Sequence, residues 1–276
     1  MPELPEVETV VRGVRPGVVG RAITGAQVHW AGSVATPLPE TFAARLTGQR
    51  IEKVWRRAKF IVADLSDDVL LIHLRMTGRL YVASSAAELE ADRWLRVAID
   101  LDNGNELRFS DMRKFGRVYL VSDVSEITGT LGPEPLDEDF SLDLFRDRIK
   151  TRGSMIKPLL LDQSFVAGIG NIYADEALWL ARIHPRRTAD TLTEDEVAQL
   201  HDSIRSVLRD GIRREGASIN WYRKPDGSKG SQQTHLYAYG REGEPCSRCG
   251  TPIIKTRLAQ RGTHYCPVCQ TEEQVQ

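Results

Sequence analysis

The sequence predicts an α+β protein with a β-rich N-terminal half, a helical segment and a small C-terminal hairpin. Short β-type segments separated by turn residues recur between residues 51 and 122, a spacing typical of an antiparallel sandwich or barrel. After a proline-rich stretch at 131–140, apolar residues recur at helical spacing. All four cysteines lie at the C-terminal end, from residue 246 onward.

The opening segment MPELPEVETV, residues 1–10, is typical of a helix start. Pro5 suits a first helical turn, and early glutamates complement the helix macrodipole. This pattern does not explain a proline at position 2. Removal of Met1 would leave Pro2 as a secondary amine beside Glu3. A free α-amine has a pKa of about 8, so part of it is unprotonated at neutral pH and can act as a nucleophile.

The predicted strands follow, and turn signals such as SDD and DNGN separate them. They cover residues 59–65, 69–76, 79–83, 95–101, 106–110 and 117–122. Two helices are predicted further on. One covers residues 171–183, and the other follows a capping box formed by Thr193 and Glu196. The polar, glycine-punctuated stretch at 220–235 has no periodicity and is long enough to be a functional loop.

The cysteines form two CxxC pairs separated by sixteen residues: Cys246 and Cys249, then Cys266 and Cys269. Two such knuckles match a four-thiolate zinc site. Four thiolates leave no open coordination position, so the metal is expected to be structural and to hold a β-hairpin with the segment RLAQRGTHY at its tip.

The composition indicates a globular protein without a membrane span or signal peptide, and we expect it in the cytoplasm. The net charge of −1 does not by itself indicate a nucleic-acid partner. Such a partner requires basic residues on one face, and residues 241–261 hold five basic side chains against two acidic ones.

The order of these parts resembles the bacterial formamidopyrimidine-DNA glycosylase family over essentially the whole chain. The motifs that carry the resemblance lie in family order: PELPEVE (2–8), RRAKF (56–60), HLRMTG (73–78), DMRKFG (111–116), GPEP (132–135), IKPLLLDQ (156–163), GIGNIYADEAL (168–178) and AQRGTHYC (259–266). The resemblance implies an N-terminal β-sandwich with a flanking helix (1–132), a linker (133–140), a helical domain with a helix–two-turns–helix element and a lesion loop near 217–234 (141–235), and a zinc-finger hairpin (236–276).

The resemblance also implies an activity: a bifunctional DNA glycosylase and AP lyase of base excision repair that removes 8-oxoguanine and formamidopyrimidines. In the family, the N-terminal proline attacks the sugar C1′ and the resulting iminium permits strand cleavage by β/δ-elimination. Pro2 matches that nucleophile, Glu3 the acid/base that protonates the sugar ring oxygen, and Lys59 a catalytic lysine beside the lesion phosphate. Glu6 matches a position near the damaged base.

The DNA contacts follow from the same match. Met76, Arg113 and Phe115 match the three residues that the family inserts where the damaged base leaves the stack, although Met76 and Phe115 are equally compatible with core packing. Lys59, Asn171, Tyr239 and Arg261 match its phosphate contacts, and Lys157 matches a lysine near the lesion. The expected partner is double-stranded DNA with oxidised bases or abasic sites, bound by a monomer.

The sequence departs from the family pattern at three positions. Trp94 and Arg96 stand where the family has a His-x-His run, and Lys114 replaces a usual arginine. Arg96 could take over a phosphate contact, whereas Lys114 cannot bind phosphate bidentately. Two alternatives stay open at this point: the sister branch that removes oxidised pyrimidines, whose PEGPE opening differs at Leu4, and a zinc-ribbon DNA-binding protein without activity.

Overall fold

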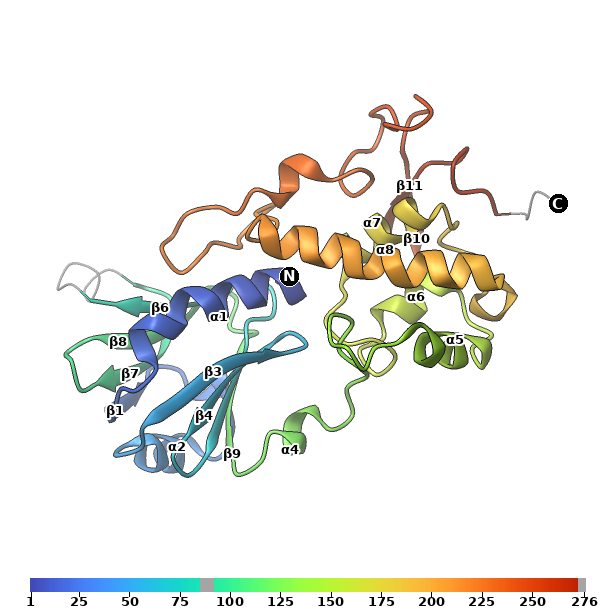
Figure 1. The fold of residues 1–276 in the computed structure, drawn as a ribbon. Coiled ribbons are helices and arrows are strands. Elements are labelled where there is room, and N and C mark those ends of the chain that lie inside the picture. Colours follow the sequence, from blue (N-terminus) through green and yellow to red (C-terminus); the bar gives the residue numbers. More distant parts are fainter. Residues whose placement is uncertain (85–91, 273–276) are drawn as a thin grey trace. The chain divides into compact units, whose positions relative to one another are not determined.

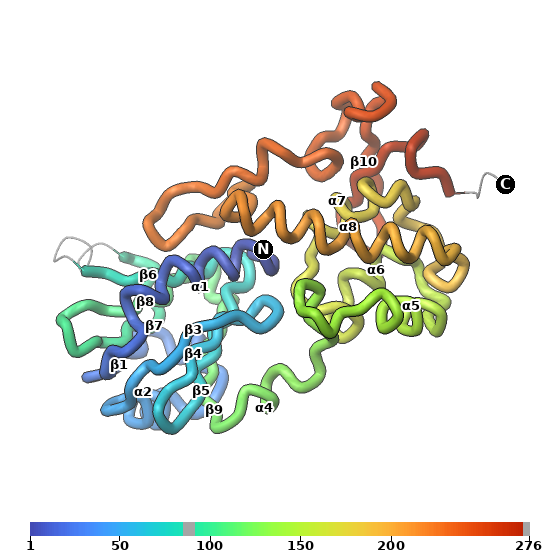
Figure 2. The backbone as a smooth tube through the Cα atoms, viewed as in Figure 1, coloured from blue at the N-terminus to red at the C-terminus, as the bar shows by residue number. Residues whose placement is uncertain are grey.

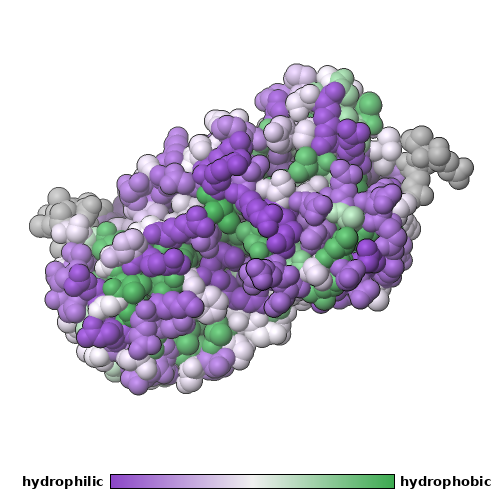
Figure 3. All heavy atoms as spheres, viewed as in Figure 1, coloured by the Kyte–Doolittle hydropathy of each residue, from purple (hydrophilic) through white to green (hydrophobic). Residues whose placement is uncertain are grey.

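The protein is described by a computed structural model that covers residues 1–84 and 92–272. The chain forms two compact units, and each is discontinuous in sequence. The first consists of Met1–Thr130 and Arg214–Ser231, and the second consists of Leu131–Arg213 and Gln232–Gln276. Hydrophilic side chains cover most of the face shown in Figure 3, with small hydrophobic patches between them.

The first unit is a β-sandwich with a flanking helix (Figure 1). One sheet has the strand order β1-β7-β8-β6 and the other the order β2-β9-β5-β4-β3. The strands are β1 (Ile23–Val28), β2 (Val34–Thr36), β3 (Ile51–Arg57), β4 (Phe60–Leu65), β5 (Val69–His73), β6 (Gly78–Ala83), β7 (Leu95–Leu101), β8 (Glu106–Asp111) and β9 (Arg117–Val121). The helices are α1 (Leu4–Val18), η1 (Ala31–Ser33), α2 (Pro39–Leu46) and α4 (Ser125–Thr128).

One hydrophobic core lies between the two sheets and α1. Inward residues such as Ile72 of β5 and Val97 of β7 pack there with the valines of α1. Successive side chains point to opposite faces of a sheet, so alternate residues of a strand reach this core. In β5, Leu70 and Ile72 belong to it, whereas Leu71 packs in a separate cluster. The predicted sandwich with a flanking helix is confirmed.

Residues 214–231 return from the second half of the chain and run alongside α1 (Figure 2). Two contacts fix them there. The backbone N–H of Ala217 donates to Glu6 Oε1 at 2.8 Å, and the Tyr222 side chain joins the sandwich core. Gly13 of α1 leaves room for Pro225, since a Cβ at this position would lie 2.7 Å from the proline ring.

The second unit is helical and ends in a two-stranded hairpin. It contains α5 (Leu142–Lys150), α6 (Ile156–Leu161), α7 (Asn171–Ala181), η2 (Ala189–Thr191), α8 (Glu194–Arg213), η3 (Gln232–His235), β10 (Ile254–Leu258) and β11 (Arg261–Tyr265). The predicted capping box of α8 is confirmed: the Thr193 N–H donates to Glu196 Oε2 at 2.8 Å, and the Glu196 N–H donates to Thr193 Oγ1 at 3.2 Å.

Two predicted element ends differ from the structure. The strand expected over 69–76 ends at His73, because the chain turns at Arg75, whose φ is 54°. The helix expected over 171–183 ends at Ala181, because Arg182 adopts a left-handed C-cap with φ of 59°. The other predicted strands lie within one residue of their observed ends. No helix in the described part of the chain is long and apolar enough to cross a membrane.

Candidate active site

The first turn of α1 buries two carboxylates beside Pro2. Glu3 is the N-cap of α1 and is 3% exposed, and Glu6 is 1% exposed. The Glu3 N–H donates to Glu6 Oε2 at 2.8 Å, while Glu6 Oε1 accepts the hydrogen bond from Ala217. Glu6 therefore connects the start of the chain to the loop that returns more than two hundred residues later.

Lys59 lies in the two-residue turn between β3 and β4, after Ala58 with its φ of 52°. Lys59 is only 5% exposed, so it is not a solvent-facing charge on the surface of the strand pair. Strands β3 and β4 both pack against α1. His73, at the end of the neighbouring strand β5, pairs with Phe60, the residue after Lys59.

His73 is held in its neutral form. Burial, then the positive charges of Arg75 and Lys59, lowers its pKa from 6.5 to about 3. Its Nδ1 accepts a hydrogen bond from the Arg75 N–H at 3.0 Å, so the ring proton is on Nε2. Apart from the position of His73 in the HLRMTG motif, nothing in the sequence indicates that this histidine is buried and neutral.

We expect His73 to make the protein sensitive to acid. Below pH 6.5 the His73 side chain is protonated in the unfolded chain, whereas in the folded protein it stays neutral down to about pH 3. The free energy of unfolding therefore falls as the pH falls through this range. Each unit of pKa difference is worth about 1.4 kcal/mol, which amounts to several kcal/mol in total. Urea unfolding at pH 7.5 and 4.5 should therefore show a smaller loss for His73→Gln than for the wild type. The exposed His29→Gln should behave like the wild type, and an equal loss in all three proteins would exclude this assignment.

The structure brings Met76, Arg113 and Phe115 together. The Arg113 guanidinium lies 4.6 Å from the Phe115 ring centroid, and its Nη1 lies 3.3 Å from Met76 Sδ. Met76 is 43% exposed and Phe115 46%. Neither side chain is part of the core, so the alternative interpretation as core packing is excluded.

Asp111 organises the two loops that carry these three side chains. This buried carboxylate accepts hydrogen bonds from the N–H groups of Arg113 (3.2 Å) and Gly116 (2.7 Å) and from the Thr77 hydroxyl. Gly116 cannot be replaced without displacement, because a Cβ there would lie 2.4 Å from Phe109. Sequence reasoning missed Asp111, since its partners are mostly backbone groups.

The three departures from the family pattern lie on the same unit. Arg96 donates from Nε to the Asp111 carbonyl at 2.8 Å, which places its guanidinium at the base of the Arg113 loop. The indole of Trp94 lies under Arg93, with 4.4 Å from guanidinium carbon to ring centroid. The Lys114 ammonium lies 5.3 Å from the Trp30 ring.

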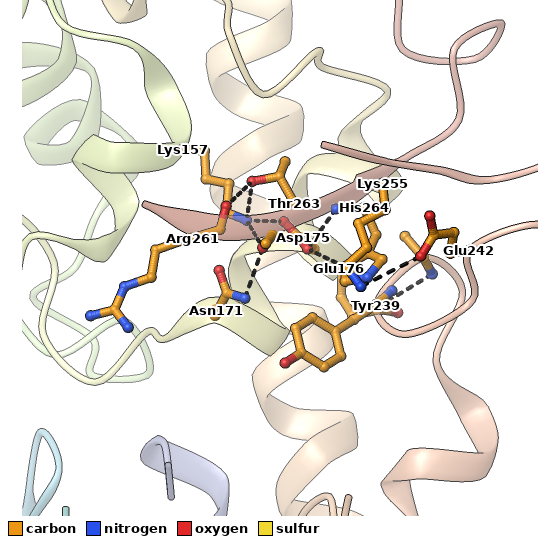
Figure 4. A network of polar contacts seen from close by, with 12 residues as sticks. Lys157, Asn171, Asp175, Glu176, Tyr239, Glu242, Lys255, Arg261, Thr263 and His264 are labelled. Carbon is orange, nitrogen blue, oxygen red and sulfur yellow. Dashed lines mark hydrogen bonds and ion pairs between the residues drawn. The ribbon is translucent and has the colours of Figure 1, made fainter. Parts of the chain in front are cut away.

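In the second unit, Asn171 begins α7, and its Nδ2 donates to the Gly262 carbonyl at 2.9 Å (Figure 4). Lys157 of α6 is 1% exposed, and its ammonium also donates to Gly262 O, at 3.0 Å. Its charge is paired with Asp175 Oδ1 at 2.6 Å. Tyr239 is half-buried and stacks edge-on against His264, with ring centroids 5.0 Å apart.

Arg261 is exposed at the tip of the β10–β11 hairpin and points away from this polar network (Figure 4). The turn before it consists of Ala259 and Gln260, both with positive φ (45° and 62°). Two such residues form the turn whose twist matches that of an antiparallel pair.

The four cysteine sulfurs lie within 4.8 Å of one another. Sγ of Cys249 lies 3.4 Å from that of Cys266, and Sγ of Cys246 lies 3.9 Å from that of Cys269. A disulfide requires about 2.05 Å, whereas tetrahedral zinc with bonds of about 2.3 Å places its sulfurs a little under 4 Å apart. The site therefore fits one structural zinc ion.

Both knuckles are fastened to the C-terminal end of α7. Arg248 of the first knuckle donates to the carbonyls of Trp179 (2.6 Å) and Leu180 (2.9 Å), and its guanidinium lies 3.9 Å from the Trp179 ring centroid. Gln270 of the second knuckle donates to Ile183 O at 2.9 Å. The metal site thereby fixes the hairpin to the helical unit.

Comparison with known proteins accounts for this arrangement. Three family models match in order: the formamidopyrimidine-DNA glycosylase N-terminal domain at residues 1–118, the H2TH domain of the same enzymes at 131–223, and the zinc finger found in FPG and IleRS at 243–271. The formamidopyrimidine-DNA glycosylase of Herpetosiphon aurantiacus is 51% identical, over 98% of this chain and 100% of the relative. The chain belongs to the formamidopyrimidine-DNA glycosylase family.

Other members of the family agree in sequence and fold. The formamidopyrimidine-DNA glycosylase of Protochlamydia amoebophila is 46% identical, over 98% of this chain and 99% of the relative. A Lactococcus lactis FPG mutant solved with DNA containing Fapy-dG superimposes with a TM-score of 0.91 at 40% identity, covering 98% of this chain and 100% of that one. The Lactococcus lactis Fpg solved with abasic-site DNA gives a TM-score of 0.89 at the same identity, covering 98% and 99%.

Proposed function

We propose that this DNA glycosylase excises oxidised purines from double-stranded DNA and then cleaves the strand, with Pro2 as the nucleophile. The observation that carries the proposal is the start of α1, where Pro2 is buried beside two carboxylates, Glu3 and Glu6. A helix start by itself requires neither the proline at position 2 nor the burial of Glu3. The family's solved complexes contain Fapy-dG and abasic-site DNA, which supports this substrate class.

The reaction begins once Met1 has been removed. The Pro2 amine attacks C1′ of the damaged nucleotide, and the bond from C1′ to the base breaks as the base departs with the amine proton. Glu3 protonates the sugar ring oxygen as the ring opens, which leaves an iminium between Pro2 and C1′. The resulting iminium acidifies the C2′ proton, which permits β-elimination followed by δ-elimination. Lys59 supports these steps from the β3–β4 turn by neutralising the neighbouring phosphate. Glu6 holds the returning loop close to the damaged base through Ala217.

The reaction requires the damaged base to leave the stack. Met76, Arg113 and Phe115 suit the space that the base vacates: a thioether and an aromatic ring can wedge between bases, and a guanidinium can hydrogen-bond the orphaned partner base. Their exposure and mutual contacts support one joint insertion.

The helical unit supplies contacts to the DNA backbone. Asn171, Tyr239 and Arg261 would bind phosphates, and a structural zinc ion would hold the hairpin whose tip carries Arg261. A bacterial repair enzyme that works on chromosomal DNA would act in the cytoplasm, at the nucleoid, and we propose that it acts as a monomer.

Arg113→Ala should slow excision of 8-oxoguanine opposite cytosine about 10- to 100-fold, because a hydrogen bond from a charged donor is worth about 1.5–3 kcal/mol. The orphaned cytosine would lose its partner, so discrimination between opposite bases should weaken as well. Single-turnover excision on duplexes with each of the four opposite bases measures both effects. Arg12→Ala on the outer side of α1 is the matched control, and equal rates for both variants would contradict the insertion.

Borohydride trapping tests the proposed nucleophile. The protein is mixed with a duplex containing 8-oxoguanine opposite cytosine and reduced, and the N-terminal peptide is analysed by mass. We expect a covalent DNA adduct on Pro2 in protein whose intact mass shows that Met1 is absent.

The control is a chain with two extra residues fixed before Pro2, which turns its nitrogen into an amide while leaving the helix intact. It should bind the duplex without forming an adduct. An adduct elsewhere in the processed protein would refute Pro2 as the nucleophile. Absence of any adduct, also on an oxidised-pyrimidine duplex, would leave a DNA-binding protein without this activity.

A further inference from the structure

Two consecutive carboxylates of α7, Asp175 and Glu176, hold the two segments that carry Arg261 and Tyr239 (Figure 4). The side chain of Asp175 is 0% exposed and Glu176 is 2% exposed. We propose that both are positioning residues that set the phosphate contacts of the enzyme. The inference rests on the proposed function, because it concerns how the DNA-contact side chains reach their places.

Asp175 connects three elements. Its Oδ1 pairs with the Lys157 ammonium of α6 at 2.6 Å. Its Oδ2 accepts the His264 N–H of β11 at 2.9 Å and lies 3.2 Å from His264 Nδ1. Lys157 completes the connection by donating to Thr263 Oγ1 at 2.8 Å as well as to Gly262 O. The strand that begins with Arg261 is thereby fixed to two helices.

The Glu176 carboxylate holds the segment that carries Tyr239, and it does so through backbone N–H groups of that segment. Its two oxygens accept hydrogen bonds from the N–H groups of three successive residues, Tyr237, Ala238 and Tyr239, each at 2.8 Å. Burial raises the pKa of Glu176, and the three N–H donors oppose that shift. Because three donors in a row converge on one carboxylate, the backbone at Tyr239 has a single orientation relative to α7.

The third contact lies on the same helix. Asn171 is one turn before Asp175, and its amide reaches the same Gly262 carbonyl that Lys157 uses. The three phosphate contacts proposed for the helical unit are therefore placed relative to α7, Asn171 directly and the other two through its carboxylates. The Lys157 ammonium contacts Gly262, Thr263 and Asp175 inside the protein, so it would affect DNA binding by positioning the hairpin.

The buried ion pair of Lys157 and Asp175 is better explained by the positioning of the elements it joins than by a gain in folding stability. Replacing such a pair by apolar residues is often neutral or stabilising, because the desolvation of two charges offsets their attraction. A misplacement of about 1 Å at a positioning group can cost about a hundredfold in rate. The pair of Lys157 and Asp175 reaches across three elements whose exact relation matters for the reach of Arg261.

Asp175→Asn tests the proposal, because it removes the charge and keeps the shape. We expect a 10- to 100-fold weaker dissociation constant for an abasic-site duplex and a slope of log K against log salt that is shallower by about one phosphate contact. Zinc content should stay at one ion per chain. The rate of strand cleavage with every duplex bound should not change, since Pro2 and Glu3 are in the other unit.

Three further variants give the test its controls. Asp143→Asn removes an exposed carboxylate of the same helical unit and should change neither affinity nor slope. Glu176→Gln should weaken binding with the same reduction in slope. The double variant Lys157→Met with Asp175→Asn should bind the abasic-site duplex no more weakly than the weaker-binding of its two single variants. The two substitutions are not additive, because both remove the same ion pair.

An unchanged salt slope in Asp175→Asn, or loss of zinc together with affinity, would assign Asp175 a structural role only and overturn the proposal. Failure of the proposed function would be recognised by a different result: the wild-type protein would form no covalent adduct on Pro2 at all. The two failures are distinguishable because affinity and slope are measured without turnover.

Discussion

Glu3→Gln is expected to lower the rate of 8-oxoguanine excision by about 10²- to 10⁴-fold, the usual contribution of a positioned general acid. Glutamine has the same shape and keeps the buried start of α1, but it cannot donate a proton to the sugar ring oxygen. The 3% exposure of Glu3 leaves little room for water to take over this role.

Single-turnover excision with saturating enzyme measures this loss without a contribution from binding. Glu8→Gln is the matched control, because Glu8 lies on the same helix but forms ion pairs with the exposed Arg12 and the largely buried Arg56. Its rate should stay close to that of the wild type. Full excision by Glu3→Gln would assign proton donation to another group.

Cys246→Ser is expected to release the zinc ion and unfold the β10–β11 hairpin. Binding of structural zinc contributes about 10–16 kcal/mol in small metal-binding peptides, which is comparable with the net stability of a whole domain. With the hairpin unfolded, Arg261 and the Gly262 carbonyl lose their positions, and the affinity for DNA should fall with them.

Zinc content, amide hydrogen exchange of residues 254–265 and DNA affinity together check this expectation. Ser247→Ala, at the exposed position next to Cys246, should leave all three unchanged. Exchange in the β-sandwich should be the same in both variants, because the four cysteines are in the other unit. A Cys246→Ser protein with bound zinc and normal affinity would contradict the four-thiolate site.

Local patterns predicted the elements well where the partner of each residue is near in sequence. The capping box of α8 needs only Thr193 and Glu196, and the two CxxC knuckles need only their spacing. Met76 was ambiguous for a physical reason: the apolar run of β5 continues to it, but the turn at Arg75 redirects the side chain to the surface.

Long-range polar contacts could not be predicted. The partners of Glu176 are backbone N–H groups 61 to 63 positions later, and a backbone group carries no signal in the sequence. Lys157 matched a position near the lesion, yet its ion pair with Asp175 depends on how α6 and α7 pack. The DNA-contact roles of individual residues therefore stay predictions that the variants above decide.

The return of residues 214–231 to the first unit affects how the protein can be made. During synthesis the β-sandwich emerges early, but Ala217 and Tyr222, which complete it, leave the ribosome only after the whole helical segment. Until then Glu6 lacks the Ala217 donor, and the core lacks the Tyr222 ring. The nascent enzyme thus acquires the finished surroundings of Glu6 late, when most of the helical unit has already been translated.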